Sequence, residues 1–186
     1  MLNYDIDWTG LARVANDLQA TDKQVKLALS RALRRTEATL RRMSSKGLRQ
    51  ELELRTAAAL RKRLKSIKLK KTGGLGNSDG VTLWYGLNDL PVSSFKGRPK
   101  STAKGAEFKG NDYDGAFVGR SKVKGKQTIF RRKGKARLSI TEQLVPIEDK
   151  AITYIEDEIF DKVEGIFWQH FRRDLASRVR YQIGGL

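Results

Sequence analysis

Apolar residues recur at intervals of three and four through the first third of the chain. This spacing predicts a short helix over residues 8–18 and a longer amphipathic helix over residues 23–46. Asp22 suits the N-cap of the second helix, and Gly47 suits its end. A third, shorter helix is predicted over Ala57–Leu64. The first 64 residues are therefore expected to be largely helical.

The middle of the chain changes to the alternating pattern that is typical of half-buried strands. Val81–Tyr85, rich in β-branched and aromatic residues, is the clearest strand, and Asn111–Gly115 is predicted to be a turn. Two segments that contain Gly, Ser and Lys, residues 93–105 and 119–127, are expected to be mobile loops. Further short strands are predicted at residues 66–71, 105–109, 115–120, 127–132 and 136–140.

Helical spacing returns in the last third of the chain. Apolar residues from Ile152 to Phe171 predict a helix within residues 146–183, with Gly165 as a possible break. At ~1.5 Å per residue an unbroken helix of this length spans ~50 Å, more than a compact monomer of this size covers. We therefore expect a partner surface to bury part of it.

The order of these elements predicts an α+β fold. N-terminal helices (residues 1–64) precede a central, mostly antiparallel sheet (residues 65–140), and the long C-terminal helix follows. No internal repeat is found. The length of 186 residues fits one domain, which is what we predict for the whole chain.

Charge is strongly segregated along this sequence. The chain carries 38 Lys and Arg against 21 Asp and Glu, a formal net charge of +17. Residues 23–71 hold 17 bases and three acids (net +14), and residues 96–137 hold 14 bases and three acids (net +11). Residues 138–164 hold two bases and eight acids (net −6). Such asymmetry favours a polyanionic partner or an acidic protein neighbour.

The composition narrows the possible chemistry. Cysteine is absent, which excludes disulfides, a thiol nucleophile and a cysteine zinc site. No apolar run approaches the ~20 residues of a membrane helix, and the first residues do not resemble a signal peptide. His170 is the only histidine, and no serine motif accompanies it. We therefore expect a protein made in a reducing cytosol, with no membrane partner.

Two kinds of enzyme site, a phosphate-binding loop and a metal-dependent nuclease site, have a partial outline in the sequence. The stretch from Gly119 to Lys126 has the wrong spacing for a phosphate-binding loop. Asp89, Glu107 and Lys109 have the outline of a metal-dependent nuclease site, which chance supplies often in so charged a chain. We expect no catalytic residue, no cofactor and no metal, and a nuclease remains the least favoured alternative.

Basic residues next to aromatic ones also suit single-stranded nucleic acid, through stacking and phosphate contacts. Trp84, Phe130 and Phe167 are the aromatic residues concerned, and we expect them to be core residues. The basic residues point to a partner instead, because residues 23–71 carry more positive charge than an ordinary solvent-exposed helix face. The residues predicted to contact DNA or an acidic partner are Arg31, Arg34, Arg35, Arg61, Arg63, Arg131, Arg132, Lys133, Lys135 and Arg137.

Several short motifs in a fixed order resemble the minor tail protein Z family of long-tailed bacteriophages and prophages. The resemblance covers about residues 8–160 and rests on order, spacing and basic charge together. The chain departs from the family at Leu138-Ser139-Ile140, where the family has a proline before the isoleucine. The matching segments are Ala28–Leu33, Leu60–Lys65, Leu87–Val92, Asp114–Val118, Ile129–Ile140 and Leu144–Ile147.

This resemblance implies a structural, non-enzymatic protein of the virion tail, assembled in the host cytoplasm. Such a protein acts in tail completion near the head-proximal end, beside other tail or neck proteins, as a homo-oligomeric ring. Segregated charge is compatible with a head-to-tail contact between the basic segment 23–71 and acids of the segment 138–164. The acids predicted at that contact are Glu148, Asp149, Glu156 and Asp157.

Under the same interpretation, the basic hairpin Arg131–Arg137 and the segment Lys96–Lys109 face either double-stranded DNA in the tail lumen or an acidic neighbouring ring. The sequence does not choose between these two. A basic nucleic-acid-binding module of a mobile element is the alternative function.

Overall fold

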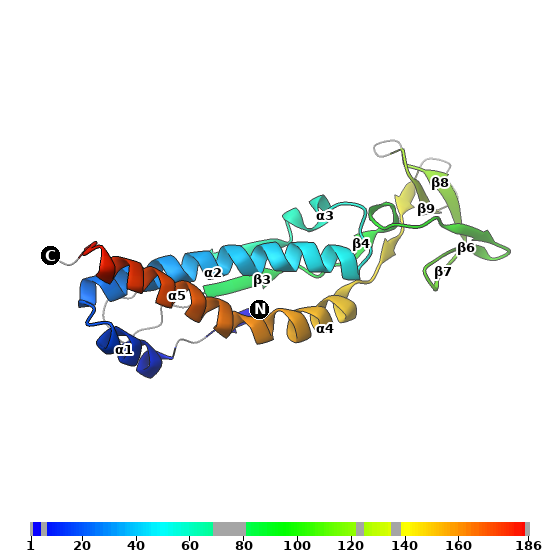
Figure 1. Cartoon of the computed structure of the whole chain (residues 1–186). Helices are drawn as coiled ribbons and strands as arrows, with labels where there is room; N and C mark the ends of the chain where they lie inside the picture. Colours follow the sequence, from blue (N-terminus) through cyan, green and yellow to red (C-terminus); the bar gives the residue numbers. More distant parts are fainter. Residues whose placement is uncertain (1, 5–6, 69–80, 122–124, 135–138, 185–186) are drawn as a thin grey trace. The chain divides into compact units, whose positions relative to one another are not determined.

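A computed structural model describes residues 2–4, 7–68, 81–121, 125–134 and 139–184 of the chain (Figure 1). Its secondary structure confirms the predicted α+β class, with N-terminal helices, small antiparallel sheets and a long C-terminal helical segment. The chain divides into two compact units. Unit 1 comprises residues 1–45, 63–86 and 155–186, and unit 2 comprises residues 46–62 and 87–154.

Unit 1 is built on three helices, α1 (Trp8–Asp17), α2 (Asp22–Glu51, whose last turns belong to unit 2) and α5 (Val163–Arg180). A capping box begins α2. The Thr21 hydroxyl oxygen accepts from the Gln24 backbone N–H at 3.3 Å, and the Gln24 side-chain oxygen accepts from the Thr21 N–H at 3.0 Å. The N-cap prediction at Asp22 was therefore wrong by one residue, because threonine supplies the capping oxygen.

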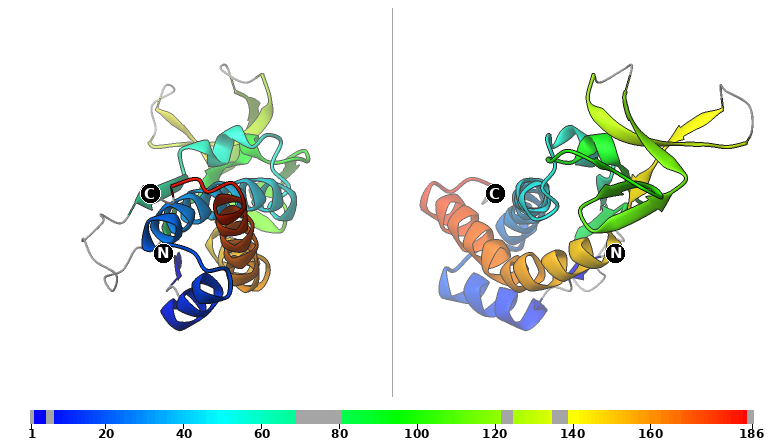
Figure 2. Two further views of the ribbon diagram at one scale, coloured as in Figure 1. Left: turned by 60° about the vertical axis from the view of Figure 1, so that its left-hand side comes forward. Right: turned by 90° about the vertical axis from the view of Figure 1, so that its right-hand side faces the viewer.

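Large apolar side chains from α2 and α5 form the core of unit 1. The two helices lie side by side in all three views (Figures 1 and 2). Phe167 and Phe171 are fully buried and stack with ring centroids 6.0 Å apart. The remaining buried members of this cluster are Leu11, Ala28, Leu29, Ala32, Leu33 and Leu175. This burial confirms the apolar stripes predicted for both helices.

A three-stranded antiparallel sheet completes unit 1, in the order β1 (Leu2–Tyr4), β3 (Val81–Tyr85), β2 (Leu64–Lys68). The prediction for β3 is confirmed. The strand β2 begins at Leu64, so the predicted helix 57–64 shrinks to α3 (Ala58–Arg61). Residues 69–71 of the predicted strand lie outside the described residues.

Unit 2 is made mainly of short strands with β-hairpin connections. Three small antiparallel sheets occur in its described part, and a 3-10 turn, η1 (Val92–Ser94), follows β4. The sheets are β4 (Leu90–Pro91) with β11 (Leu144–Val145); β5 (Lys100–Thr102), β6 (Gly105–Phe108) and β7 (Asn111–Asp114); and β8 (Ala116–Arg120), β9 (Gln127–Arg132) and β10 (Ile140–Glu142).

One loop prediction and one turn prediction in unit 2 differ from the structure. The segment 93–105 contains η1 and β5, because Phe95 is buried against Phe108 and pairs with Leu54 across an isolated bridge. Most of the predicted turn Asn111–Gly115 is strand β7. The turn comes just before this strand, at Lys109 and Gly110, which both have positive φ. In the other predicted loop, residues 122–124 lie outside the described residues.

Two helix ends also differ from the prediction. α2 continues through Gly47 to Glu51, and Gly47 lies under the Tyr154 ring of α4 (Glu148–Glu158). The C-terminal helical segment breaks at η2 (Phe160–Lys162) instead of at Gly165. The break at η2 carries neither glycine nor proline, the usual sequence signals for one.

Candidate functional site

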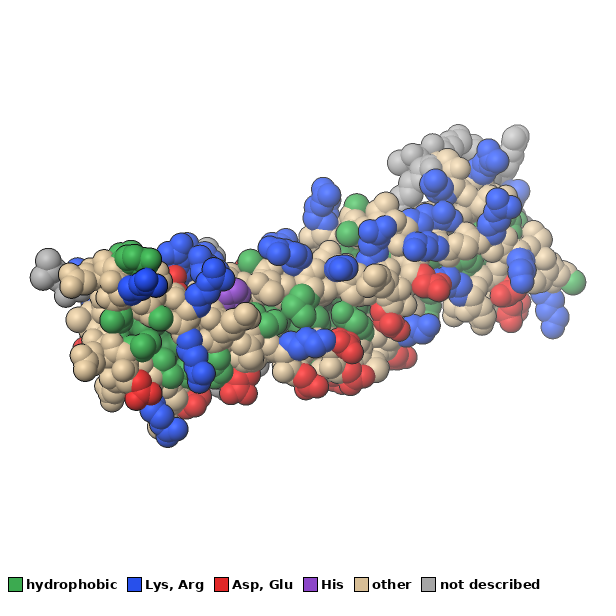
Figure 3. Space-filling model, in the orientation of Figure 1, with side chains coloured by type: hydrophobic (Ala, Val, Ile, Leu, Met, Phe, Trp, Pro, Cys, Tyr) green, Lys and Arg blue, Asp and Glu red, His purple; other side chains and the backbone are tan. Residues whose placement is uncertain are grey.

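Unit 1 presents a basic face along α2. Arg34 is exposed, and the exposed neighbours Arg41 and Arg42 follow it about two turns further along the helix. Figure 3 shows basic side chains spread along α2. Within the described part of the chain these three arginines have no carboxylate at ion-pair distance. The predicted contact residue Arg34 therefore lies on an open basic surface.

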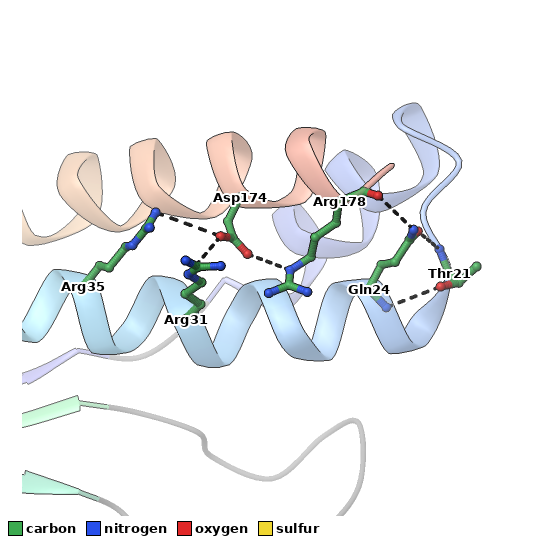
Figure 4. A network of polar contacts seen from close by, with 6 residues as sticks. All are labelled: Thr21, Gln24, Arg31, Arg35, Asp174 and Arg178. Carbon is green, nitrogen blue, oxygen red and sulfur yellow. Dashed lines mark hydrogen bonds and ion pairs between the residues drawn. The ribbon is translucent and has the colours of Figure 1, made fainter. Parts of the chain in front are cut away.

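The neighbouring arginines Arg31 and Arg35 are engaged by a buried acid. Asp174 of α5 is only 6% exposed, and its carboxylate lies 3.4 Å from the Arg31 Nε and 3.9 Å from the nearer nitrogen of Arg35 (Figure 4). Arg178, one turn along α5, donates from Nε to the same carboxylate at 2.7 Å. Asp174 thus neutralises part of this side of α2 and joins it to α5.

Sequence reasoning missed this network. The one feature of the sequence that could have indicated it is Asp174, the only acid in residues 165–186, which also hold four bases. A second polar contact follows it along the helices, because the Gln24 side-chain amide donates to the Arg178 carbonyl oxygen at 3.3 Å. The network makes Arg31 and Arg35 partly structural, whereas Arg34, Arg41 and Arg42 are exposed cations of α2 outside it.

His170 also lies in unit 1, where its Nε2 is 3.4 Å from the Thr39 hydroxyl oxygen. Burial lowers the pKa of His170 below the ordinary value of 6.5, and the nearby charges of Arg35 and Arg173 lower it further. The imidazole is therefore neutral near pH 7 and sits beside cations. Among the residues the structure describes, no carboxylate is hydrogen-bonded to its ring.

Unit 2 presents its own basic surface at the β9–β10 hairpin, where β9 ends. Arg131, Arg132 and Lys133 are exposed there, and Lys135 and Arg137 lie outside the described residues. The Arg132 guanidinium lies 5.9 Å from the centroid of the Phe117 ring. Of the other predicted bases, Arg61 is exposed on α3 in unit 2, and Arg63 is half-buried next to β2 in unit 1.

The predicted acids all lie exposed on α4. Figure 3 shows acidic side chains gathered over this helix. The structure describes no ion pair for any of the four, although Glu158 pairs with Lys162 at 2.5 Å on the next turn. The four are Glu148, Asp149, Glu156 and Asp157. Open anionic charge on α4 therefore accompanies open cationic charge on α2.

Two of the three residues in the nuclease outline, Glu107 and Lys109, have partners outside it. Lys109 forms an ion pair with Glu53, and the hydrogen bond and charge of Lys109 lower the pKa of that carboxyl. The Glu107 carboxylate accepts from the Gly110 backbone N–H at 3.4 Å. Within the described ranges, no group of three or more His, Asp or Glu side chains is placed to hold a metal ion.

Comparison with known proteins gives no match: no family model, no curated protein and no solved structure is similar to the chain. None of the helices in the described ranges has the length and apolar character needed to cross a membrane.

Proposed function

We propose that this chain is a structural protein of a bacteriophage-type virion tail, which acts in tail completion near the head-proximal end. It assembles there as a homo-oligomeric ring beside other tail or neck proteins. The ordered resemblance to the minor tail protein Z family over residues 8–160 motivates this function. The observation that carries it is the presence, on one chain, of two open surfaces of opposite charge on α2 and α4.

Opposite charges left open on one molecule favour association between copies. In a head-to-tail contact, Arg34, Arg41 and Arg42 of one copy meet Glu156 and Asp157 of the next. Because these side chains are exposed, the attraction mainly speeds and orients the encounter. Apolar contacts must then supply most of the affinity. Ile152 and Phe160, next to these acids, are 37% and 41% exposed and suit that role.

The experiment is to add purified protein to tail tubes that lack a terminal ring and to image the tube ends by electron microscopy. The proposal predicts a ring of fixed stoichiometry at one end of each tube. Protein that stays unbound at all concentrations would contradict it. The size of the protein with and without tubes, measured by sedimentation, shows whether the ring forms only on its template.

Contact with double-stranded DNA in the tail lumen is the second role, and the β9–β10 hairpin is the surface that favours it. Three consecutive exposed bases, Arg131, Arg132 and Lys133, are suited to phosphate contacts. The same surface is the one that a nucleic-acid-binding module of a mobile element would use. The salt dependence of binding to a DNA duplex tests both roles.

A further inference from the structure

A cavity of about 510 Å³ opens in unit 2, between the segment that follows α2, the 3-10 turn η1 and the start of β9. This volume is typical of small-ligand sites. The residues that line it are Arg55, Thr56, Ala58, Ala59, Ser93, Ser94 and Lys126. Two of these are cations, three carry hydroxyl groups, and none is acidic, so the lining is chemically suited to an anion.

The Arg55 side chain is held in place but incompletely satisfied. One terminal nitrogen of its guanidinium donates to the Gly97 carbonyl oxygen at 2.9 Å. Its Nε–H is buried and has no acceptor in the described structure. A buried donor without an acceptor is costly, and a charged one more so, which indicates that a ligand or solvent oxygen completes the site.

Hydrogen bonds hold the backbone around Arg55 and the 3-10 turn η1 in unit 2. The Arg55 backbone N–H donates to the Ser94 carbonyl oxygen at 2.9 Å, and the Lys96 N–H donates to the Glu53 carbonyl oxygen at 2.8 Å. The Ser93 N–H donates to the Glu142 carboxylate at 3.0 Å. These bonds hold the backbone at Arg55 and at η1, so the Arg55 side of the cavity is preorganised.

Charge at the cavity is also not neutralised by the protein. No carboxylate of the described chain lies within ion-pair distance of Arg55 or Lys126. The nearest acid in the hydrogen-bond pattern, Glu142, already accepts from the Thr128 hydroxyl at 2.5 Å as well as from Ser93. An anion bound there would therefore not compete with a carboxylate of the described chain for Arg55 or Lys126.

We propose that this cavity binds the phosphate group of a phosphate ester, with Arg55 and Lys126 as its cationic contacts. Guanidinium, ammonium and hydroxyl donors around one space suit a group with several oxygens, and the methyl groups of Ala58 and Ala59 leave an apolar surface for the organic body. Two sources share this chemistry: the backbone of double-stranded DNA and a free phosphate compound. The inference does not depend on the proposed tail function.

The test uses the full chain and two probes, inorganic phosphate and a short DNA duplex. In an NMR titration with phosphate, we expect saturable shifts at the Arg55 Nε–H and at the Ala58 and Ala59 amides. Arg55→Gln should weaken phosphate binding by about tenfold or more, because it removes a charged hydrogen bond. Lys100→Gln, which removes an exposed charge from β5 outside the cavity, should leave it unchanged.

Lys126→Gln provides the same test if Arg55→Gln fails to fold, because the Lys126 side chain is exposed and forms no ion pair with the described part of the chain. If the duplex displaces phosphate and reverses its shifts, the bound phosphate group belongs to DNA. If the duplex leaves the phosphate shifts unchanged, the ligand is a free phosphate compound. The proposal is overturned if phosphate gives no saturable shift at Arg55, or if Lys100→Gln weakens binding as much as Arg55→Gln and Lys126→Gln do.

Discussion

The carboxylate of Asp174 lies 2.7 Å from the Nε of Arg178, and both side chains are largely withdrawn from solvent, at 7% and 12% exposure. Arg31 contacts the same carboxylate from α2, but its side chain is 54% exposed. Because desolvation strengthens a charge pair and raises the cost of breaking it, the two arginines depend on Asp174 to different degrees.

Asp174→Asn should therefore be strongly destabilising. It leaves Arg178 buried without a counter-charge, and the free energy of unfolding should fall by about 3 kcal/mol. Arg31→Ala, which breaks only the exposed contact, should cost less than about 1 kcal/mol. Urea unfolding followed by circular dichroism measures both. Similar small losses for the two variants would show that Asp174 is not the anchor between α2 and α5.

Gly47→Ala tests why α2 passes through a glycine. A methyl group at Gly47 would lie 1.6 Å from the Tyr154 hydroxyl oxygen, so the ring must move and the stability should fall by about 1–3 kcal/mol. Gly165→Ala on α5 is the matched control, since nothing lies within 4 Å of its added methyl group. That variant should gain up to ~1 kcal/mol from helix propensity. A gain at both positions would contradict the predicted contact.

His170 makes the stability of unit 1 depend on pH. Because its pKa is lowered in the folded state, the unfolded chain binds the proton more tightly. Stability should therefore fall as the pH drops below the ordinary value of 6.5, through the lowered pKa. His170→Gln should remove this component of the pH dependence. Identical pH profiles of thermal unfolding for the variant and the wild type would contradict the assignment.

DNA binding by the β9–β10 hairpin should be salt-dependent. The double variant Arg132→Gln, Lys133→Gln should lower the log–log salt slope by about 0.9 for each lost phosphate contact. Arg13→Gln on α1, an equally exposed charge in an acidic segment, is the control. Fluorescence anisotropy with a duplex gives the slopes. A flat salt dependence in the wild type would remove DNA contact as a role for this surface.

The sequence predicts local structure best where side-chain periodicity and burial agree. The stripe on α2 and the β-branched run of β3 are such places, and both predictions are confirmed. It fails where residues distant in the sequence meet: the Tyr154 ring packs where a side chain at Gly47 would lie, and Phe95 packs against Phe108. The Asp174 network and the Arg55 cavity could not be predicted, because their members are brought together only by tertiary packing.

The most direct measurement of the ring hypothesis is charge reversal on tail tubes. Arg41→Glu with Arg42→Glu places acid against acid across the head-to-tail contact, and Glu156→Arg with Asp157→Arg places base against base. Terminal rings counted by electron microscopy should be lost with each pair of changes and restored when all four are combined. Rings that form equally well with every variant, or that the combined variant does not restore, would contradict this contact.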